Sequence, residues 1–440
     1  MLLNGDDYNV KKIIVVMLLM FTLSQAEASS LPEKYDLRTL NRITSVKNQG
    51  ISGPCWAFAA LAAMESNYLT QNLGKVPDLS EMQLAYYLYK DPTASKAFTS
   101  KHTSGTLALE GNATRASSFL MRLSGPTEER NLPYTTQISD SQRKALNKKE
   151  PEDYKRVMRL RDAYFLNGSN TLNDNIKKEL IMKYGAIVVS YYSDPMAYHT
   201  KNKHYTYYNP SHGTKTNHDV VIAGWDDNFS RNNFKPKPSR DGAWLVKNSW
   251  GTMRGSEKGY VWISYAQHLK GGTAFIVEKG SQRLRCYSYD DLGFCNLVNY
   301  SWAANVFRIR ERKEILKEVS IYTYENNMTY ELYIYSTGEN APASPIKGEL
   351  KASTKGKLDL AGYHTINLPE RITLNSGEYF SVVLKLSGVS FPVETKRKDY
   401  SMNAVVHDRE SYFSRDGRNW LDGKNLDSNA CIKAFTETKN

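Results

Sequence analysis

The sequence predicts an α+β protein, in which a domain of mixed helices and strands precedes an all-β sandwich or jelly-roll domain. Three observations lead to this fold class. At 440 residues the chain is too long for one ordinary hydrophobic core. Helical and strand-like patterns mix from about residue 31 to 280, whereas only short alternating runs separated by turns follow. We therefore expect a mixed domain over 31–280 and a β-sandwich over 285–440, with a boundary between 280 and 300.

The mixed domain is predicted to begin with helices and to end with strands. The Ala-rich stretch CWAFAALAAMESNYLTQN has helical composition and begins at Cys55. A second helix is expected in LSEMQLAYYLY, where Ser80 and Glu81 form a helix-start signal. The stretch NDNIKKELIMKYG predicts a third helix that ends at Gly185 and leads into the strand AIVVSYY. Three further strands are expected in DVVIAGW, AWLVKN and YVWISY.

The C-terminal domain is predicted from five short runs in which apolar and polar residues alternate. They are KEVSIYTY, TYELYIYS, GYHTINL, EYFSVVLKL and CIKAFTE. Turns rich in Gly, Asn, Pro and Ser separate these runs, and helical periodicity is nearly absent. This pattern is typical of a β-sandwich or jelly roll.

The chain is basic, with a formal net charge of +12 and a pI near 9.2. This charge permits contact with anionic surfaces such as cell walls, polysaccharides or acidic lipids. The Lys and Arg residues are scattered and no nucleic-acid-binding motif occurs, so nucleic acid is not expected as a partner. The 30 tyrosines and 7 tryptophans are expected to pack on strands rather than to stack on ligands.

Residues 1–28 have the features of a secretory signal peptide. Two lysines precede the apolar run IIVVMLLMFTL, and an Ala-x-Ala exit ends at Ala28. The apolar run is too short to span a bilayer of about 30 Å as a helix. We therefore expect a secreted or cell-surface protein, soluble from about Ser29 and without a transmembrane anchor. The acidic leader MLLNGDDYNV fits a signal poorly and suggests a true start near Val10.

The chain contains four cysteines, Cys55, Cys286, Cys295 and Cys431. In an exported protein Cys286 and Cys295 are close enough along the chain to close a loop, which would leave Cys431 unpaired if Cys55 stays free. The sequence leaves this pairing open. No CxxC motif and no Cys/His cluster with zinc spacing occurs, so a structural metal bound by cysteine is not expected.

Cys55 has the surroundings of a nucleophile. Gly53 and Pro54 precede it and a predicted helix follows, so the thiol would lie at a helix N-terminus, where the partial positive charge favours the reactive thiolate. Gln49 precedes it on a Gly-containing loop, and its side-chain amide with the backbone N–H of Cys55 would form a two-donor oxyanion hole. A lone cysteine before a helix is more often structural, so Cys55 needs a base to support this interpretation.

His218 and Asn248 are the best candidates for that base and its orienting partner. Of eight histidines, His218 is the one at the start of a clearly apolar strand, and about thirty residues later AWLVKNSWG contains Asn248. If the two strands pair, the Asn248 amide oxygen can accept from one imidazole nitrogen while the other faces the thiolate. Trp250 would shield that hydrogen bond from water. Alone, a histidine at a strand start is usually a satisfied polar residue.

The motifs QGISGPCWAF, NHDVVIAGW and WLVKNSWG, in this order and at these separations, resemble those of papain-like cysteine peptidases. LPEKYDLR resembles the mature N-terminus of that family, LSEMQL its second helix, EGN and SGPTEERNLPY its substrate strand and following loop, and GYVWISY its last strand. The resemblance covers roughly residues 31–280 and implies a two-lobed domain, with a helical lobe and a β-barrel-like lobe.

Carried over residue by residue, the resemblance implies Cys55 as nucleophile, His218 as acid and base, Asn248 as orienter and Gln49 as oxyanion donor. The reaction would be acyl transfer from a peptide to water. No cofactor and no metal are implied, and a monomer that acts on protein or peptide substrates is expected. Five residues are predicted to bind substrate: Gly53, Trp56, Gly111, Asp219 and Trp250.

The chain departs from the family pattern at several positions. Ser52 stands where most animal and plant relatives have a disulfide cysteine, so the loop before Cys55 must hold without that bridge. Asp219 follows His218 where the family usually has a small residue near the substrate pockets. A carboxylate there would favour a basic or polar residue at P2, the second residue before the scissile bond; alternatively Asp219 turns away to a surface partner. Only about two residues separate Ala28 from LPEKYDLR, whereas the family normally has a long inhibitory prosegment there. We therefore expect an enzyme that is released active, or one restrained by something other than its own prosegment.

The C-terminal stretches CYSYDDLGF, GYHTINL, SRDGRNWLD and CIKAF resemble the lectin-like domain that follows the peptidase in some bacterial and archaeal surface enzymes. Such a domain could bind a surface glycan, a wall polymer or calcium. SRDGRNWLDG lacks the spacing of an EF-hand and reads equally well as a hairpin turn, so calcium is weakly supported. Two rival functions are a wall-peptide amidase, which would not be expected to carry the QG-x-x-x-x-CW and NSWG motifs together, and an adhesin or glycan-binding protein with a vestigial peptidase domain.

Overall fold

The computed structural model describes residues 31–90, 111–166, 173–253, 255, 257–310, 312–397, 401 and 404–438. The chain divides into an N-terminal unit, Met1–Glu33, and a second unit, Lys34–Asn440. The predicted signal peptide, residues 1–28, lies outside the described residues.

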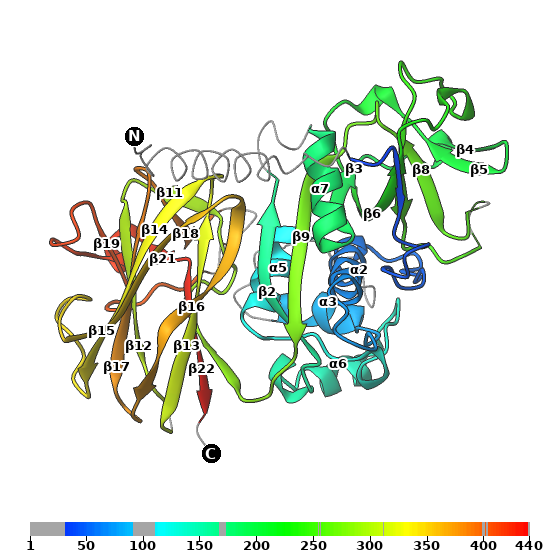
Figure 1. Cartoon of the computed structure of the whole chain (residues 1–440). Helices are drawn as coiled ribbons and strands as arrows, with labels where there is room; N and C mark the ends of the chain where they lie inside the picture. Colours follow the sequence, from blue (N-terminus) through cyan, green and yellow to red (C-terminus); the bar gives the residue numbers. More distant parts are fainter. Residues whose placement is uncertain are drawn as a thin grey trace, which may run out of the picture. The chain divides into compact units, whose positions relative to one another are not determined.

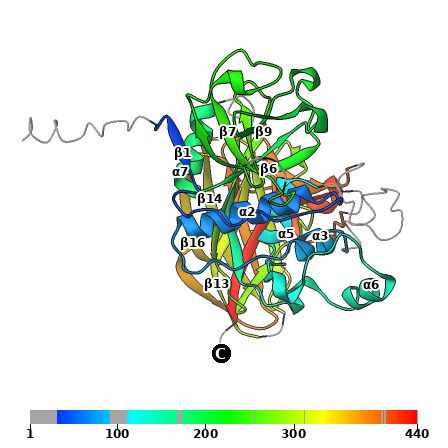
Figure 2. The same cartoon turned by 90° about the vertical axis from the view of Figure 1, so that its right-hand side faces the viewer.

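The helices belong to the first half of this unit, as the sequence predicts, and α2 is its central helix (Figures 1 and 2). It begins at Cys55 directly after Pro54, and every side chain from Trp56 to Tyr68 is buried. A helix that is apolar on all sides is a core helix, which explains its many alanines. The α-helices described are α2 (Cys55–Thr70), α3 (Glu81–Lys90), α5 (Ala113–Met121), α6 (Asp140–Leu146) and α7 (Asp174–Tyr184).

The predicted helix boundaries follow from local chemistry. The Ser80 hydroxyl accepts a hydrogen bond from the backbone N–H of Gln83 at 3.1 Å, which caps the start of α3. The predicted end of α7 at Gly185 is also found, and this glycine has φ of +89°. That left-handed conformation ends the helix and is accessible to glycine at little cost.

One large sheet runs through the described part of the second unit. Its strand order is β10-β22-β13-β16-β2-β9-β3-β6-β7-β8-β5-β4, and β1 pairs with β6. The strands of the first half are β1 (Lys34–Asp36), β2 (Met158–Phe165), β3 (Ile187–Tyr191), β4 (Tyr198–Lys201), β5 (His204–Tyr207), β6 (His218–Asp226), β7 (Ala243–Lys247), β8 (Tyr260–Ser264) and β9 (Lys270–Lys279). The three strands predicted in DVVIAGW, AWLVKN and YVWISY are β6, β7 and β8, which are neighbours in this order.

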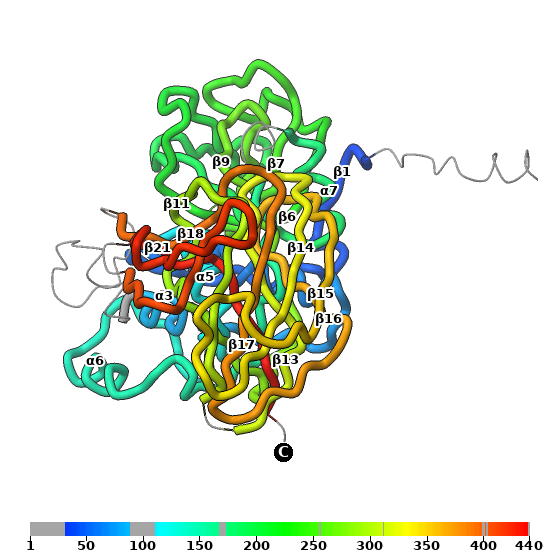
Figure 3. The backbone as a smooth tube through the Cα atoms, turned by 90° about the vertical axis from the view of Figure 1, so that its left-hand side faces the viewer, coloured from blue at the N-terminus to red at the C-terminus, as the bar shows by residue number. Residues whose placement is uncertain are grey.

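The second half is built of strands, as the alternating runs predict, with one short 3₁₀ turn at Gly423–Leu426 (Figures 1 and 3). Besides the large sheet, it contains a six-stranded sheet in the order β15-β14-β17-β12-β19-β20 and a three-stranded sheet in the order β11-β18-β21. The strands are β10 (Leu284–Tyr287), β11 (Asn296–Val298), β12 (Trp302–Arg308), β13 (Glu314–Thr323), β14 (Met328–Gly338), β15 (Glu349–Leu358), β16 (Ala361–Leu374), β17 (Tyr379–Leu386), β18 (Phe391–Thr395), β19 (Ser411–Ser414), β20 (Leu421–Asp422), β21 (Ser428–Ala430) and β22 (Ile432–Thr438).

Alternation along these strands separates an inner apolar face from an outer face. In β17, for example, Phe380, Val382 and Leu384 point into the core. This core also takes residues from β12, β13, β14 and β22. The large sheet continues from one half into the other where β16 pairs with β2, so the two halves share a sheet rather than meeting only through loops. The boundary between 280 and 300 stays a prediction.

Candidate active site

Three separate elements bring the predicted catalytic residues to one place. Cys55 is the first residue of α2, His218 is the first residue of β6, and Asn248 follows the last residue of β7. β6 and β7 pair in antiparallel register, with Val221 opposite Lys247. This is the pairing that the sequence required for His218 and Asn248 to meet. Cys55 and His218 line the same cleft.

The imidazole of His218 is held by an amide and an indole. Its Nε2 lies 2.9 Å from the Asn248 Oδ1. An amide oxygen only accepts hydrogen bonds, so Nε2 carries the proton in the neutral ring and Nδ1 is left as the acceptor. The ring of Trp250 stacks on the imidazole, with centroids 4.9 Å apart and planes at 23°. Both contacts restrict the orientation of the ring.

The Cys55 sulfur lies against backbone donors. The backbone N–H of Asp219 donates to the Cys55 Sγ at 3.5 Å. Burial, and then the carboxylate charge of Asp219, raise the pKa of the Cys55 thiol to about 12, while the backbone N–H groups of Asp219, Trp56 and Cys55 itself act in the opposite direction. Without a cationic neighbour the thiol therefore stays protonated.

Burial also favours the neutral form of His218. It lowers the pKa of this imidazole to about 4, although the hydrogen bond with Asn248 acts to raise it. A lone thiolate and a lone imidazolium are thus both disfavoured at this site. Their charges would offset each other if they formed together as a pair, which ties formation of the thiolate to proton transfer onto His218.

Gln49 is fixed at both ends of its side chain. Its Nε2 donates to the Ser52 carbonyl at 2.8 Å, and its Oε1 accepts from the Ser249 hydroxyl at 2.5 Å. The Tyr134 hydroxyl donates to the Gln49 carbonyl at 2.9 Å. Ser52, which stands in place of a disulfide cysteine, donates from its hydroxyl to the Thr136 carbonyl at 3.2 Å. Hydrogen bonds thus hold the loop before Cys55.

The cleft has a volume of about 680 Å³. Six of the residues singled out from the sequence line it: Gly53, Cys55, Trp56, Gly111, His218 and Asp219. Among the described residues, the cleft lining does not include Gln49, Asn248 or Trp250. Asn248 and Trp250 contact the lining residue His218, and Gln49 bonds to Ser52, next to the lining residue Gly53. Gly111 lies flat on Trp56, because a Cβ at Gly111 would come within 2.4 Å of the indole ring. Only glycine fits there.

Asp219 does not turn away to the surface. Its Oδ1 accepts from the Ser190 hydroxyl at 2.5 Å, and both residues line the cleft. Burial raises the pKa of Asp219 to about 6, against the Ser190 hydrogen bond and the positive charge of Lys270. Lys270 also lines the cleft, and no sequence motif had indicated that this lysine would lie at the site.

A buried ionic cluster behind the cleft was not anticipated from the sequence. Lys47 Nζ lies 2.9 Å from Glu81 Oε1 and 3.3 Å from Glu65 Oε1. Thr44 links Glu65 to Lys247, donating to Glu65 Oε2 at 2.5 Å and accepting from Lys247 Nζ at 3.0 Å. Lys47 is two residues before Gln49, and Lys247 directly precedes Asn248. The cluster therefore fixes both catalytic loops to α2 and α3.

All four cysteines are free, so Cys286 and Cys295 do not form the loop-closing disulfide that the sequence allowed. No group of three or more His, Cys, Asp or Glu residues that could hold a metal occurs in the part of the chain that the structure describes. In SRDGRNWLDG, the Asp416 Oδ1 accepts from the backbone N–H groups of Arg418 and Asn419, both at 2.9 Å. The segment is the turn of the β19–β20 hairpin, and calcium has no support there.

Over the described residues, no helix is both long and apolar enough to cross a membrane.

Comparison with known proteins identifies both halves. The model of the family described as papain family cysteine protease matches residues 31–279, and that of the lectin like domain matches residues 286–436. A probable cysteine protease, RD19D of Arabidopsis thaliana, is 30% identical over 58% of this chain and 63% of its own length. A viral cathepsin of the Choristoneura fumiferana nuclear polyhedrosis virus is 28% identical over 52% of this chain and 58% of its own length. The chain thus spans about six tenths of the length of these curated relatives.

Two solved structures resemble both halves together. The clostridial cysteine protease Cwp84 after propeptide cleavage aligns over 92% of this chain and 99% of its own, with 25% identity and a TM-score of 0.76. The cysteine protease and lectin-like domains of Cwp84, described as a surface layer associated protein of Clostridium difficile, align over 93% of this chain and 89% of their own, with 24% identity and a TM-score of 0.75. The order of a papain-like half and a lectin-like half is therefore shared.

Proposed function

The chain belongs to the papain family of cysteine proteases and is a cysteine-type peptidase. On that premise we propose that it is an endopeptidase, which hydrolyses peptide bonds with Cys55, His218, Asn248 and Gln49 as its catalytic residues. The observation that carries this assignment is the 2.9 Å hydrogen bond between His218 Nε2 and Asn248 Oδ1, made at the edge of the cleft that Cys55 lines. It leaves Nδ1 of His218 as the nitrogen available to the thiol.

The acylation step follows from these positions. The Cys55 thiol gives its proton to His218 Nδ1, and the thiolate attacks the carbonyl carbon of the substrate. The C–N bond then breaks, and the imidazolium returns the proton to the leaving amine. Asn248 accepts from Nε2–H throughout, which stabilises the imidazolium and keeps the ring in place.

The oxyanion formed during attack needs two donors. The Gln49 amide donates one N–H to Ser52, and an amide carries two. We assign its second N–H, together with the backbone N–H of Cys55, to the oxyanion. In deacylation water attacks the thioester carbon, His218 takes a proton from that water, and the Cys55 sulfur leaves with the proton restored.

Labelling with a thiol-directed peptidyl epoxide tests this assignment. The full chain is incubated with the epoxide and then with a peptide library, and the labelled residue is located by mass spectrometry. We expect one label, on Cys55, and complete loss of cleavage. Cys286, Cys295 and Cys431 provide internal controls, since they lie away from the cleft lining. Label on one of those three with cleavage retained, or no cleavage by the unlabelled protein, would reject the assignment.

We also propose that the cleft prefers a basic or polar P2 residue. Asp219 is in the cleft wall, which supports the sequence-based hypothesis, but Lys270 is in the same wall and offsets part of its charge. Equal cleavage of peptides with Arg and Leu at P2, unchanged in Asp219→Ala, would reject this preference.

Export to the cell surface or the medium is proposed from residues 1–28 and from the likeness to Cwp84, which is described as a surface layer associated protein. The C-terminal half is proposed to bind a surface glycan or wall polymer, since the lectin like domain model matches it and the chain carries a net charge of +12. Cosedimentation of the Cys55→Ala protein with purified cell walls, with bovine serum albumin as the non-binding control, tests this binding.

A further inference from the structure

One wall of the cleft carries no catalytic group. It consists of the start of α5 and the end of β2, and we call it the α5–β2 wall; its residues are Gly111, Asn112, Ala113, Thr114, Phe165 and Leu166. Given the proposed function, this wall borders the bound peptide, and its β2 part lies beside β9, the strand that carries Lys270, with Phe165 paired to Thr273. What keeps the wall in place decides which peptides bind.

The C-terminal half, residues 284–438, pairs with β2 at the end that reaches the cleft. β16 places Ala361 opposite Phe165 and Gly362 opposite Tyr164. Gly362 has φ of +133°, and a Cβ there would lie 2.0 Å from the Ala163 carbonyl oxygen. The close approach of the two strands therefore requires glycine at this position.

Aromatic rings of the C-terminal half stand directly behind the wall. The ring of Phe165 lies 6.2 Å from that of Tyr322, centroid to centroid. Tyr322 in turn packs on Tyr363 at 4.9 Å and on Phe294 at 4.6 Å. Phe165, Tyr322 and Tyr363 are all buried, so these contacts are packed interior rather than surface.

The other part of the wall, the start of α5, is held in the same way. The Tyr363 hydroxyl lies 3.1 Å from the Ser118 Oγ in α5, and that Oγ donates to the carbonyl of Thr114, a residue of the wall, at 3.0 Å. Arg122, just after α5, forms an ion pair with Asp291 at 3.1 Å. Tyr363 thus contacts both elements that make the wall.

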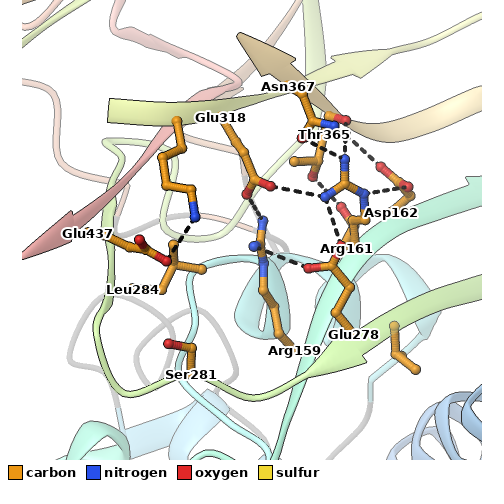
Figure 4. Close-up of polar contacts among 12 residues, drawn as sticks. Arg159, Arg161, Asp162, Glu278, Ser281, Leu284, Glu318, Thr365, Asn367 and Glu437 are labelled. Atoms are coloured by element: carbon orange, nitrogen blue, oxygen red, sulfur yellow. Dashed lines mark hydrogen bonds and ion pairs between the residues drawn. The ribbon is translucent and has the colours of Figure 1, made fainter. Parts of the chain in front are cut away.

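An ionic network fixes the register of β2 against the C-terminal half farther from the cleft (Figure 4). Arg159 donates to Glu318 Oε2 at 2.6 Å, and Arg161 to Glu318 Oε1 at 3.0 Å. Arg161 also donates to Glu278 on β9 at 2.8 Å and to Asn367 on β16 at 3.1 Å. A slip of β2 along β16 would break these bonds together, so the position of Phe165 is fixed.

We propose that the C-terminal half is a structural part of the substrate cleft: it positions the α5–β2 wall, and Gly362 and Tyr363 are the positioning residues through which it acts. Substrate affinity and P2 selectivity then depend on this contact, whereas the reactivity of Cys55 toward small reagents does not. In the described sheet β16 pairs with β13 and β2 and not with β6 or β7, which bring His218 and Asn248 to the site.

The test is Gly362→Val in the full chain, since a valine side chain forces β16 away from Ala163. We expect KM for a peptide substrate to rise about tenfold and the P2 profile to broaden, with kcat within about twofold. The rate of Cys55 alkylation by iodoacetamide should stay within about twofold. The matched control is Gly356→Val in β15, a strand that pairs with β14 and not with β2, which should leave KM unchanged.

Tyr363→Phe is the second variant, in case Gly362→Val does not fold. It removes only the hydroxyl that contacts Ser118, so a smaller rise in KM, about two- to threefold, is expected. Unchanged KM and P2 profile in both variants would overturn the proposal. A parallel fall in kcat, alkylation rate and thermal stability would overturn it as well, because that would be general destabilisation.

Binding measured without catalysis separates this proposal from the proposed function. Affinity for a fluorescent substrate peptide is measured on Cys55→Ala protein with and without Gly362→Val. If the parent protein neither cleaves peptides nor reacts with the epoxide, the proposed function fails. If the parent does both and the Gly362→Val substitution does not weaken peptide binding, only the positioning proposal fails.

Discussion

Buried polar side chains occur both at the cleft that Cys55 lines and in the interior of the C-terminal half, and these two regions use them differently. In the C-terminal half Lys433 and Asp290, both almost fully buried, pair with each other. In the same interior the Ser411 hydroxyl donates a hydrogen bond to the Asn305 Oδ1 at 2.7 Å. These four side chains lie in a closed interior, and their ion pair and hydrogen bond stabilise the folded structure.

In the cleft, the corresponding groups border an open space of about 680 Å³. His218 uses Nε2 on Asn248 and leaves Nδ1, and the Cys55 sulfur accepts from the backbone N–H of Asp219 at 3.5 Å. The His218 Nδ1 and the Cys55 sulfur can therefore still interact with a substrate. A buried polar group becomes chemically useful when the fold satisfies one side of it and leaves the other side open. The following predictions test this contrast.

The largest effect is expected from Cys55→Ala. Cleavage should fall on the order of 10³-fold or more, because the attacking atom is lost. The thermal unfolding temperature near neutral pH should change little, because burial keeps the Cys55 thiol protonated in the folded parent and the substitution removes no charge. Peptide hydrolysis and a thermal melt measure both; Cys431→Ala serves as the control that keeps activity. Cleavage by the Cys55→Ala protein at the parent rate would contradict the contrast.

The second-largest effect is expected on the free energy of unfolding. Lys433→Met leaves the Asp290 carboxylate buried without its cation, at a cost of about 3–5 kcal/mol near neutral pH. Burial already raises the pKa of Asp290, against the attraction of Lys433, and the variant raises it further. An acid with a raised pKa in the folded state stabilises the fold when protonated, so the loss should be smaller at pH 5 than at pH 8.

Chemical denaturation at the two pH values measures this loss. The double variant Lys433→Met with Asp290→Leu should recover much of it, because no buried charge remains. The kcat of the folded Lys433→Met protein should stay within about twofold of the parent. A fall in kcat as large as that of a cleft variant would contradict the contrast.

Asn248→Ala is expected to lower kcat on the order of 10²-fold while leaving the unfolding temperature nearly unchanged. The variant removes the acceptor of His218 Nε2–H, so the ring loses its orientation and the imidazolium its partner. Asn248→Asp, which keeps an acceptor oxygen, should recover part of the activity. Steady-state kinetics measures whether kcat falls from the parent to Asn248→Asp and further to Asn248→Ala. Equal kcat for the two variants would argue against an orienting role of Asn248.

The smallest effect is expected from Asp219→Asn. The Asp219 charge raises the pKa of the Cys55 thiol, second to burial, so removing that charge lowers the pKa of the thiol. Asp219 itself has a pKa of about 6, so it is neutral in the parent below that pH. Alkylation of Cys55 by iodoacetamide should therefore be faster in the variant above pH 6, and the two rates should converge below it. Ser190→Ala, which removes a hydrogen bond that lowers the pKa of Asp219, should move the convergence to higher pH.

Much of the fold was predictable because its signals are local. The alanine-rich run at Cys55, the Ser80 cap, the glycine after Tyr184 and the alternating runs of the second half each specify an element within a few residues. The candidate site was predictable for a related reason, since QGISGPCW, NHDVVIAGW and WLVKNSWG each keep a functional residue in a short motif. The lining residue Lys270 and the cluster of Lys47, Glu65 and Glu81 have no such motif.

The sequence by itself determined that Cys55 begins a helix, that His218 begins one strand and Asn248 ends another strand-like run, and that a β-rich half follows a mixed one. Only the tertiary structure decided what stands behind the cleft: the ionic cluster that holds the catalytic loops, and the pairing of Gly362 with Tyr164 that brings the C-terminal half against the substrate wall. The physical reason is distance along the chain. Helix starts and strand alternation depend on neighbouring residues. Contacts such as Lys47 with Glu81, 34 positions apart, or Gly362 with Tyr164, about two hundred positions apart, depend on how the whole chain packs.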